Sequence, residues 1–475
     1  MVDTVIGYLN TLFWSYILVY GLLAVGVYFT VRLGFLQFRH FGECFKVLFS
    51  GAREDREGIS PFQALCTSLA SRVGTGNIAG VALALTLGGP GAIFWMWVVA
   101  LVGMSTAYAE SALAQLYKYR DEEGQFRGGP AHYMARGLNM PIMGHVFAVV
   151  LIFTFGLVFN AVQSNSIAAA MQEAFGVPEL MSGAALVLGA GIVIFGGVRG
   201  IAHFAEKVVP VMAGVYLLVV LYVVLANITV VPELLYTIVA QAFGWQEAAG
   251  GVAGGVMAAL MNGIRRGLFS NEAGMGSAPN IAACAVPDPH HPASQGFVQA
   301  LGVFIDTIVV CTATALLIML SGVYEVGGAL TGTALTQAAA ADQIGVAGTY
   351  FVAVAILFFA FTTIVANYSY AENAMLFLEH GWKPGVLVLR LLALAMVLWG
   401  SVQSVATVFN AADAAMGLMA TINLVAIVWL SPKVVLLTRD YLAQRKAGQV
   451  PEFKLEAHPQ LAKGVERDIW GSEGK

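Results

Sequence analysis

Two stretches of this sequence, SRVGTGN (71–77) and NGIRRGLFSNEAGMG (262–276), lie inside long apolar runs that cover residues 61–87 and 250–283. Each combines several glycines with polar and charged side chains, which are costly at the depth of a membrane helix. Both stretches are therefore unfavourable in a continuous helix. We predict two helices that break at these positions, midway along their length.

Gly74 and Gly76 in the first stretch permit backbone angles outside the helical region, which would free amides and carbonyls from the helical ladder. A freed backbone group in hydrocarbon costs several kcal/mol unless a partner satisfies it. Amides at the start of a half-helix suit a carboxylate, and carbonyls at the end of the preceding half suit a cation. The pattern indicates a site for an ion and a zwitterion. Two glycine-rich packing kinks are the structural alternative.

The composition is typical of a membrane protein. Of the 475 residues, 58% are apolar and only 11% are charged, and the mean hydropathy is +0.77. A soluble domain carries roughly 25% charged residues, so the composition excludes a soluble enzyme, a nucleic-acid-binding protein and a disordered scaffold. The four cysteines form no CxxC pair, and we expect neither a disulfide framework nor a zinc site.

Apolar runs of about 20 residues identify membrane spans, because a helix of that length crosses the hydrocarbon layer. Eleven runs of this kind predict an all-α polytopic membrane protein. The first run is not expected to be a cleavable signal peptide, since it lacks a basic leading region and a small-residue cleavage site. The expected spans are 12–31, 61–87, 92–117, 145–172, 182–197, 204–226, 250–283, 295–320, 347–378, 386–402 and 405–430.

The positions of Lys and Arg predict the orientation. With the N-terminus outside, the inward-facing segments hold 21 of the 24 Lys and Arg residues, and the other three, Arg72, Arg265 and Arg266, fall inside spans. The outer connections carry acidic residues instead, Glu247 among them. We expect a plasma (inner) membrane protein with its N-terminus outside and its C-terminus in the cytoplasm, where the polar tail 432–475 is expected to be solvated.

Setting the first span aside leaves ten, and the two broken spans are the first of each five. They run through the membrane in opposite directions, and paired interrupted spans in inverted repeats are typical of secondary transporters. We therefore expect one transmembrane domain with four parts. These are an extra first helix and inner loop (1–60), a first five-helix repeat (61–226), a second inverted repeat (250–431) and the tail (432–475).

Four motifs carry a resemblance to a known family. The stretch GGPGAIFWMWVVALVG (88–103) resembles the signature of the alanine/glycine:cation symporters, also called sodium:alanine symporters. FSNEAGMGSAP (269–279), GGPAHYM (128–134) and QSNSIA (163–168) are similar to other stretches of that family. The family is related to the leucine-transporter fold, which has two inverted repeats of five helices.

The resemblance implies import of alanine or glycine with Na⁺, with D-alanine as a further candidate and no organic cofactor. It also implies a sodium site built from main-chain carbonyls and threonine hydroxyls, as a hard cation requires. On the residues alone, the threonines could equally bond carbonyls of their own helix. The implied sodium ligands are Ala70, Val73, Phe359, Thr362 and Thr363.

For the amino acid, the resemblance implies a carboxylate held by the amides of the first break and an ammonium group facing carbonyls around 267–270. Phe269 is the candidate apolar lid or floor. Many family members carry Trp where this chain has Asn367, so a slightly larger substrate such as serine is conceivable. The expected substrate-binding residues are Gly74, Thr75, Gly76, Asn77, Gln163, Asn165, Phe269, Ser270, Asn271 and Asn367.

Charged side chains inside the spans cost roughly 2.5–3.5 kcal/mol each, so they should have partners. We expect Arg72 to pair with Asp306 and to take the place of a second Na⁺. Glu272 is expected to pair with Arg265 or Arg266. Glu110 and Glu372 should snorkel toward the inner surface, and His290 and His291 should be solvated loop residues rather than metal ligands.

Other functions are less well supported. A proton-coupled carrier of another small solute on the same fold is the main alternative. An enzyme is not expected, because the spans contain no HExxH motif and no GxSxG motif beside a suitable base. The expected partners are a small amino acid and membrane lipid, with no nucleic acid. The oligomeric state stays open.

Overall fold

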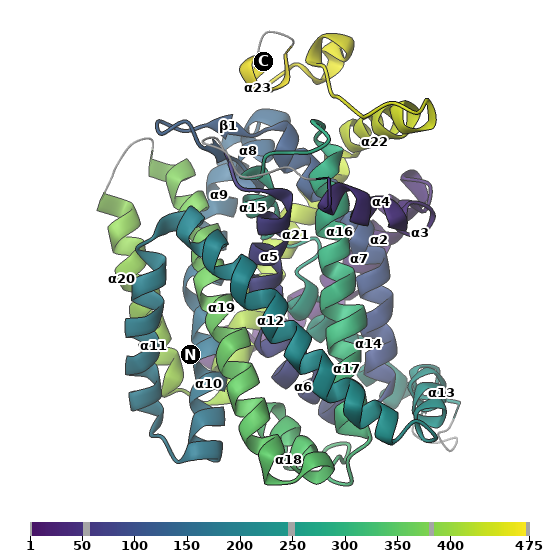
Figure 1. Ribbon diagram of the computed structural model, residues 1–475, viewed down its shortest axis with the longest axis vertical. Helices are drawn as coiled ribbons and strands as arrows, with labels where there is room; N and C mark the ends of the chain where they lie inside the picture. The colour runs from purple at the N-terminus through teal and green to yellow at the C-terminus, as the bar shows by residue number, and fades with distance from the viewer. Residues whose placement is uncertain (1, 51–57, 246–251, 380–383, 472–475) are drawn as a thin grey trace.

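The computed structural model describes residues 2–50, 58–245, 252–379 and 384–471 (Figure 1). Glu247 and the Lys and Arg residues of segments 51–57 and 380–383 lie outside these ranges. The described part is almost entirely helical, with one two-stranded antiparallel hairpin.

Eight helices in the described ranges are long and apolar enough to cross a membrane. They are α1 (Val2–Asn10), η1 (Thr11–Leu18) and α2 (Val19–Arg32) as one helix; α7 (Gly91–Leu116); α9 (Pro141–Leu151), η4 (Ile152–Val158) and α10 (Phe159–Phe175) as one helix; α12 (Gly197–Ala226); α16 (Ala293–Val303), η5 (Phe304–Cys311) and α17 (Thr312–Met319) as one helix; α19 (Val346–Glu379); α20 (Pro384–Ser401); and α21 (Val405–Trp429).

Three other expected spans correspond to shorter or interrupted helices. α11 (Glu179–Ile194) is apolar but short. The first predicted broken span consists of α5 (Pro61–Arg72), η2 (Gly76–Gly80) and α6 (Val81–Gly88). The second consists of α14 (Val252–Asn271) and α15 (Pro279–Ala283).

The first break lies where the sequence predicts it. α5 begins at a capping box, in which Ser60 accepts the Gln63 amide and the Gln63 side chain accepts the Ser60 amide. The helix ends at Arg72, and Val73 leaves the helical region with φ −77° and ψ 83°. Neither glycine of this break has a positive φ, so the expectation that their backbone freedom causes the break is wrong.

The second break starts later than predicted. Residues 262–271 remain in α14, and the chain leaves the helix only at Glu272, which has φ 59°. Gly274 (φ 90°) and Gly276 (φ 80°) then adopt angles that other residues rarely reach. Gly263 fills a packing role instead of unwinding the helix, because an added Cβ would lie 2.4 Å from the Ala92 carbonyl of α7.

The smaller elements lie at two ends of the molecule (Figure 1). α18 (Gly332–Ile344) lies at the end opposite the C-terminus, where α13 (Val231–Ala242) also lies. The other end holds α3 (Leu36–Arg39), α4 (Phe41–Leu48), β1 (Tyr119–Arg120), β2 (Phe126–Arg127), α8 (Pro130–His132) and η3 (Tyr133–Gly137).

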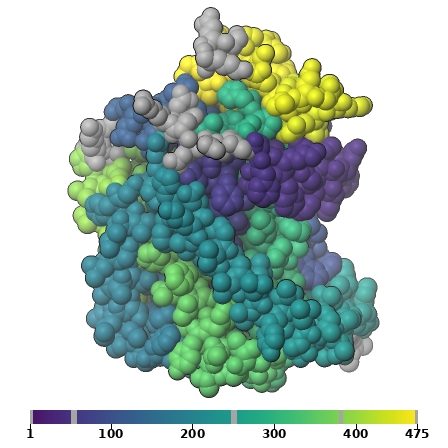
Figure 2. All heavy atoms as spheres, in the orientation of Figure 1, coloured from purple at the N-terminus to yellow at the C-terminus, as the bar shows by residue number. Residues whose placement is uncertain are grey.

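The C-terminal tail packs on this second end instead of being solvated, which corrects the sequence expectation (Figure 2). Trp470 is buried, with its ring 4.9 Å from His290, and the Phe453 amide donates to the His290 carbonyl. Arg136 pairs with Glu466 at 2.6 Å. The tail comprises α22 (Ser431–Lys446), η6 (Leu455–Ala457), η7 (Pro459–Leu461) and α23 (Arg467–Trp470).

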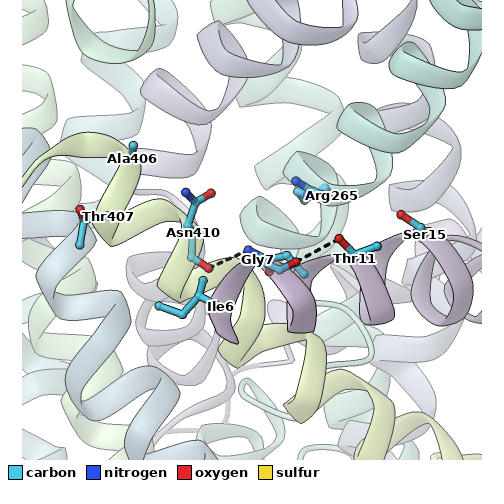
Figure 3. A pocket seen from close by; sticks show the side chains of 9 residues that line it. Ile6, Gly7, Thr11, Ser15, Arg265, Ala406, Thr407 and Asn410 are labelled. Atoms are coloured by element: carbon cyan, nitrogen blue, oxygen red, sulfur yellow. Dashed lines mark hydrogen bonds between the residues drawn. The ribbon is translucent and has the colours of Figure 1, made fainter. Parts of the chain in front are cut away.

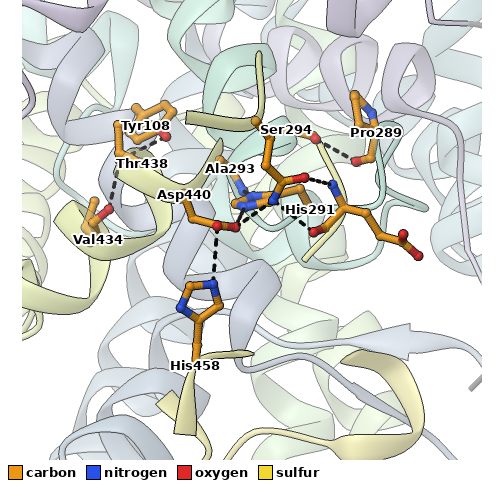
Figure 4. Close-up of polar contacts among 11 residues, drawn as sticks. Tyr108, Pro289, His291, Ala293, Ser294, Val434, Thr438, Asp440 and His458 are labelled. Carbon is orange, nitrogen blue, oxygen red and sulfur yellow. Dashed lines mark hydrogen bonds and ion pairs between the residues drawn. The ribbon is translucent and has the colours of Figure 1, made fainter. Parts of the chain in front are cut away.

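A pair of histidines shares one carboxylate at the base of the tail (Figure 4). Asp440 on α22 lies 3.1 Å from His291 Nε2 and 3.3 Å from His458 Nε2. His291 is therefore buried rather than solvated, although its neighbour His290 is only partly buried. Among the described residues, no group of three or more His, Cys, Asp or Glu side chains could hold a metal ion.

We expect the tail to loosen as the pH falls below about 6.5. Burial lowers the pKa of His291, so its contribution to stability is present above the ordinary histidine value and is lost as the pH falls. Partial burial opposes the charge on Asp440, but the hydrogen bonds from His291 and Gln444 and the charges of His291 and His458 together outweigh it and lower the pKa of Asp440, so this contribution persists to lower pH. His290 and His458 are the other titratable groups that face this pair.

Amide hydrogen exchange of residues 453–470 should therefore be faster at about pH 5.5 than at about pH 8, after correction for the intrinsic rate. The H291Q variant should show a smaller difference, because its side chain cannot take up a proton. Equal protection of the wild-type tail at both values would contradict this expectation.

Candidate functional site

The two breaks lie against each other in the interior of the molecule. A Cβ added at Gly76 would lie 3.1 Å from Phe269 Cδ1 and 3.2 Å from Ser270 Cα. The start of η2 therefore touches the end of α14, and a side chain at position 76 would separate them. Thr75, Asn77 and Ser270 are completely buried.

The amides of the first break are satisfied by side-chain oxygens. The Gly74 amide donates to Asn77 Oδ1 at 2.9 Å, and the Thr75 amide donates to Gln163 Oε1 at 3.0 Å. The Thr75 hydroxyl donates to the same Gln163 oxygen at 2.6 Å. These acceptors are neutral amide oxygens at the place where the sequence predicts a carboxylate.

Asn77 also joins three elements through its side-chain nitrogen. That nitrogen donates to Asp306 Oδ1 on η5 at 2.7 Å and to Ser270 Oγ on α14 at 3.2 Å. The other Asp306 oxygen accepts the Ser270 hydroxyl at 2.7 Å and the Thr307 hydroxyl at 2.6 Å. Asp306 is thus part of the site, although the sequence pattern suggested it only as a partner for Arg72. The sequence signal that could have placed Asp306 in the site is its carboxylate, which stands alone inside an apolar span.

The structure brings together four of the five expected sodium ligands. The Thr363 hydroxyl lies 2.8 Å from the Ala70 carbonyl of α5 and 2.9 Å from the Phe359 carbonyl. The Thr362 hydroxyl lies 2.9 Å from the same Phe359 carbonyl. Each threonine thus bonds its own helix, as the alternative interpretation holds, but Thr363 also reaches across to α5. No hydrogen bond between Val73 and these residues occurs in the described part of the chain.

The two expected site residues of α10 face different directions. Gln163 reaches the first break, as expected. Asn165 instead donates to the carbonyls of Gly400 at 3.1 Å and Gln403 at 2.6 Å, so its expected place in the site is wrong. Two residues apart on a helix lie about 200° around its axis, so both cannot face one cavity.

Phe269 belongs to an aromatic cluster beside the breaks. Its ring centroid lies 4.9 Å from that of Phe159 and 5.6 Å from that of Phe409. The Arg266 guanidinium lies over both Phe269 (5.7 Å) and Phe409 (5.5 Å), within the range of a cation–π contact. The position fits the expected role of an apolar wall.

The remaining expected residues flank the second break. Asn271 accepts the Ala273 amide at 3.0 Å, and its buried side-chain nitrogen has no partner in the described structure. Asn367 accepts the Ser71 hydroxyl at 2.7 Å and donates to Asn160 at 3.2 Å. Because α14 continues to Asn271, the expected free carbonyls at 267 and 268 lie within the helix. The carbonyls at the end of α14 are instead those of residues 269–271.

Several expected ion pairs are not formed. Arg72 donates to the Gln299 carbonyl at 3.3 Å and forms no ion pair with Asp306. The expectation that its charge takes the place of a second Na⁺ stays a prediction. Glu272 accepts the hydroxyls of Ser71 at 2.7 Å and Ser277 at 2.6 Å. It does not pair with the arginines of α14, both of which contact Asp413 of α21.

Glu110 organises the second break and does not snorkel. It is completely buried and accepts the amides of Gly274 at 3.3 Å and Gly276 at 3.2 Å. Asn423 also donates to it, at 2.8 Å. A carboxylate that accepts several amides is well satisfied without a cation. Its position toward the inner end of the third apolar run gave no indication of these partners.

Glu372 is also buried rather than exposed at the inner surface. It accepts the Tyr368 hydroxyl at 2.5 Å and lies 3.6 Å from the Arg390 guanidinium. The partly exposed arginine comes from α20, so the acidic group on α19 has a partner on the neighbouring helix.

Comparison with known proteins identifies close relatives. The model of the sodium:alanine symporter family matches residues 1–455. The probable sodium/glutamine symporter GlnT of Bacillus subtilis is 48% identical over 95% of this chain and 93% of its own length. The putative sodium/proton-dependent alanine carrier protein YrbD of the same organism is 41% identical, with 98% and 97% covered.

A solved structure shows a similar fold. The manganese transporter of Eremococcus coleocola, in a mutant form, superposes with a TM-score of 0.50 and 15% identity, and the match covers 79% of this chain and 78% of that one. At this identity the similarity concerns the fold alone.

Substitution of Gly74 by alanine should abolish ligand binding at the first break. The new Cβ would lie 2.3 Å from Thr363 Oγ1 and 2.9 Å from Gln163 Oε1, so both oxygens would have to move. Gly80→Ala is the matched control on the same broken span, because the nearest atom to its Cβ is 3.8 Å away. We expect thermal stabilisation by alanine with Na⁺ to be lost in G74A and retained in G80A. Equal behaviour of the two purified variants would contradict this assignment.

Proposed function

Because the chain belongs to the sodium:alanine symporter family, we propose that it imports a small neutral amino acid, alanine or glycine, together with Na⁺ by alternating access. At the level of the family it is a cation-coupled amino-acid symporter and not an enzyme. D-Alanine and serine are further candidate substrates. The name of the 48% identical relative makes glutamine another substrate to test.

We place eleven membrane spans in this chain. The eight long helices supply eight of them, and α11, the α5–η2–α6 segment and the α14–α15 segment supply three. Residues 61–226 and 250–431 then form the two inverted repeats, each starting with a broken span. The distribution of Lys and Arg supports an outer N-terminus and a cytoplasmic C-terminus in the inner membrane.

One observation carries the sodium assignment. The Thr363 hydroxyl bridges the Ala70 carbonyl at the end of α5 and the Phe359 carbonyl of α19. A Na⁺ ion between them would receive these three oxygens and the Thr362 hydroxyl, with the Val73 carbonyl of the same segment as the fifth proposed ligand. Oxygen ligands of this kind suit a hard cation. The ion would then replace hydrogen bonds that now hold the same groups together.

The amino acid would bind on the other side of the same unwound turn. Its carboxylate would take over the amides of Gly74 and Thr75 from Asn77 and Gln163, with the Gly76 amide as a further donor. The ammonium group would face the last carbonyls of α14, between Phe269 and Asn271. Phe269 would cover the methyl side chain, and Asn367 leaves this part of the site more polar than a tryptophan would.

Binding of the two ligands is coupled because both use one segment of backbone. The Ala70 carbonyl, on the sodium side, is four residues from the Gly74 amide on the substrate side. Na⁺ would hold this segment in the conformation that the carboxylate needs, so each ligand raises the affinity for the other. The Na⁺ gradient and the membrane potential, about 2.3 kcal/mol per charge per 100 mV, would drive import.

Uptake of labelled alanine into proteoliposomes tests the proposal directly. We expect uptake with an inward Na⁺ gradient and none when K⁺ replaces Na⁺. A proton-coupled carrier, which the name of the relative YrbD keeps open, would instead take up substrate without Na⁺ when the outer pH is lowered. That result would contradict sodium coupling, and competition by glycine, D-alanine, serine and glutamine would define the substrate range.

Thr363→Ala should raise the Na⁺ concentration for half-maximal uptake by about tenfold or more, since it removes an oxygen ligand. Thr421→Ala is the control, because within the described ranges the Thr421 hydroxyl bonds only the Gly417 carbonyl of its own helix. Sodium-dependent uptake at equal protein levels should separate the two variants. If T363A and T421A lose activity in parallel with expression, Thr363 has a packing role.

A further inference from the structure

A polar cavity of about 520 Å³ lies apart from the two breaks, between η1 with the end of α1, α14 and the beginning of α21 (Figure 3). Its polar lining comes from all three helices and consists of Asn10, Thr11, Ser15, Arg265, Thr407 and Asn410. In Figure 3 Arg265 projects into this space above the first helix. Cavities of about 300–1,000 Å³ are typical for small ligands.

The cavity carries an uncompensated positive charge. Asp413 is contacted by both Arg266 and Arg265, the latter at 3.6 Å, so one carboxylate serves two guanidinium groups. The Arg265 side chain is 22% exposed and packs over the Trp14 ring at 5.2 Å, and its Nε has no partner in the described structure. No acidic side chain lines the cavity among the described residues. An anion would therefore be attracted to this position.

The cavity lies beside a layer of side chains that separates it from the two breaks. Arg266, next to Arg265 on α14, covers the rings of Phe269 and Phe409. Asn410, next to Phe409 on α21, lines the cavity. In the proposed orientation, α21 begins at the outer side, so a ligand in the cavity is separated from the two breaks by this Arg–Phe–Phe layer.

We propose that this cavity is an outer docking site for the carboxylate of the amino acid, occupied before the substrate passes the aromatic layer. The carboxylate would accept hydrogen bonds from Arg265, whose planar guanidinium suits a carboxylate. Asn10 Oδ1, which has no partner in the described structure, and the neighbouring hydroxyls would accept hydrogen bonds from the ammonium group. As a step in import, this docking site rests on the proposed function; as a carboxylate site, it rests on the charge and the lining alone.

A cysteine introduced at the exposed Asn410 would report on the cavity. The four native cysteines are all buried, so N410C would supply the one accessible thiol of the described chain. The measured quantity is the rate of modification by an anionic methanethiosulfonate divided by the rate by a cationic one. We expect this ratio to be about fivefold lower in N410C/R265Q than in N410C, because the positive charge is lost. The ratio should be restored in N410C/R265K, which keeps the charge.

Occupancy is tested by protection, with propionate as the probe because it has the carboxylate of alanine and no ammonium group. In phosphatidylcholine vesicles without Na⁺, propionate should slow modification of N410C and leave N410C/R265Q unaffected. Ethylamine, which lacks the carboxylate, should not protect. Absence of propionate protection, or an unchanged rate ratio in R265Q, would overturn the proposal.

Lipid binding and the transport step are tested separately from the carboxylate site. If slowing occurs only when phosphatidylglycerol is added to the vesicles, a lipid headgroup occupies the cavity and the proposal fails. The double variant N410C/T363A, expected to be defective in sodium-driven uptake, should still show propionate protection. Protection without any alanine uptake by the wild type would refute the transport proposal while retaining the carboxylate site, so the two failures are distinguishable.

Discussion

An unwound backbone inside an apolar protein must find partners for its amides and carbonyls, and this requirement shapes the rest of the structure. At the first break the partners are neutral oxygens, from Asn77 and Gln163. At the second break the carboxylate of Glu110 accepts two amides and is itself held by Asn423. Each break therefore has hydrogen-bond partners within the protein, supplied by its own Asn77 and by polar side chains of neighbouring helices.

The two breaks differ in the side chains that satisfy their amides. Hydrogen bonds to an ionised acceptor are about twice as strong as those between neutral groups. The carboxylate of the proposed ligand would therefore bind the amides of Gly74 and Thr75 more strongly than the neutral Asn77 and Gln163 oxygens do. At the second break both amides share the one Glu110 side chain.

The sequence predicted local features of the fold well. The positions of the apolar helices and the first break follow from composition and glycine placement, and both agree with the structure. Glycine chemistry was misjudged, however, because Gly74 is required for close approach to Thr363 and not for an unusual φ. The predicted break began too early in α14 for the same reason, because the glycines of this helix allow close contact with α7 and do not break the helix. The two predicted ion pairs were wrong, because Arg72 donates to the Gln299 carbonyl and Glu272 accepts the hydroxyls of Ser71 and Ser277.

The docked tail has a mechanical consequence. Trp470 and Phe453 pack on the loop that precedes α16, and Glu466 is tied to Arg136 beyond the end of α7. The first of these segments leads into α16, and Arg136 lies in η3 ahead of α9, so the tail holds together two segments that are far apart in the chain. Any movement that separates these two segments would have to break the aromatic contact at His290 or the ion pair between Arg136 and Glu466.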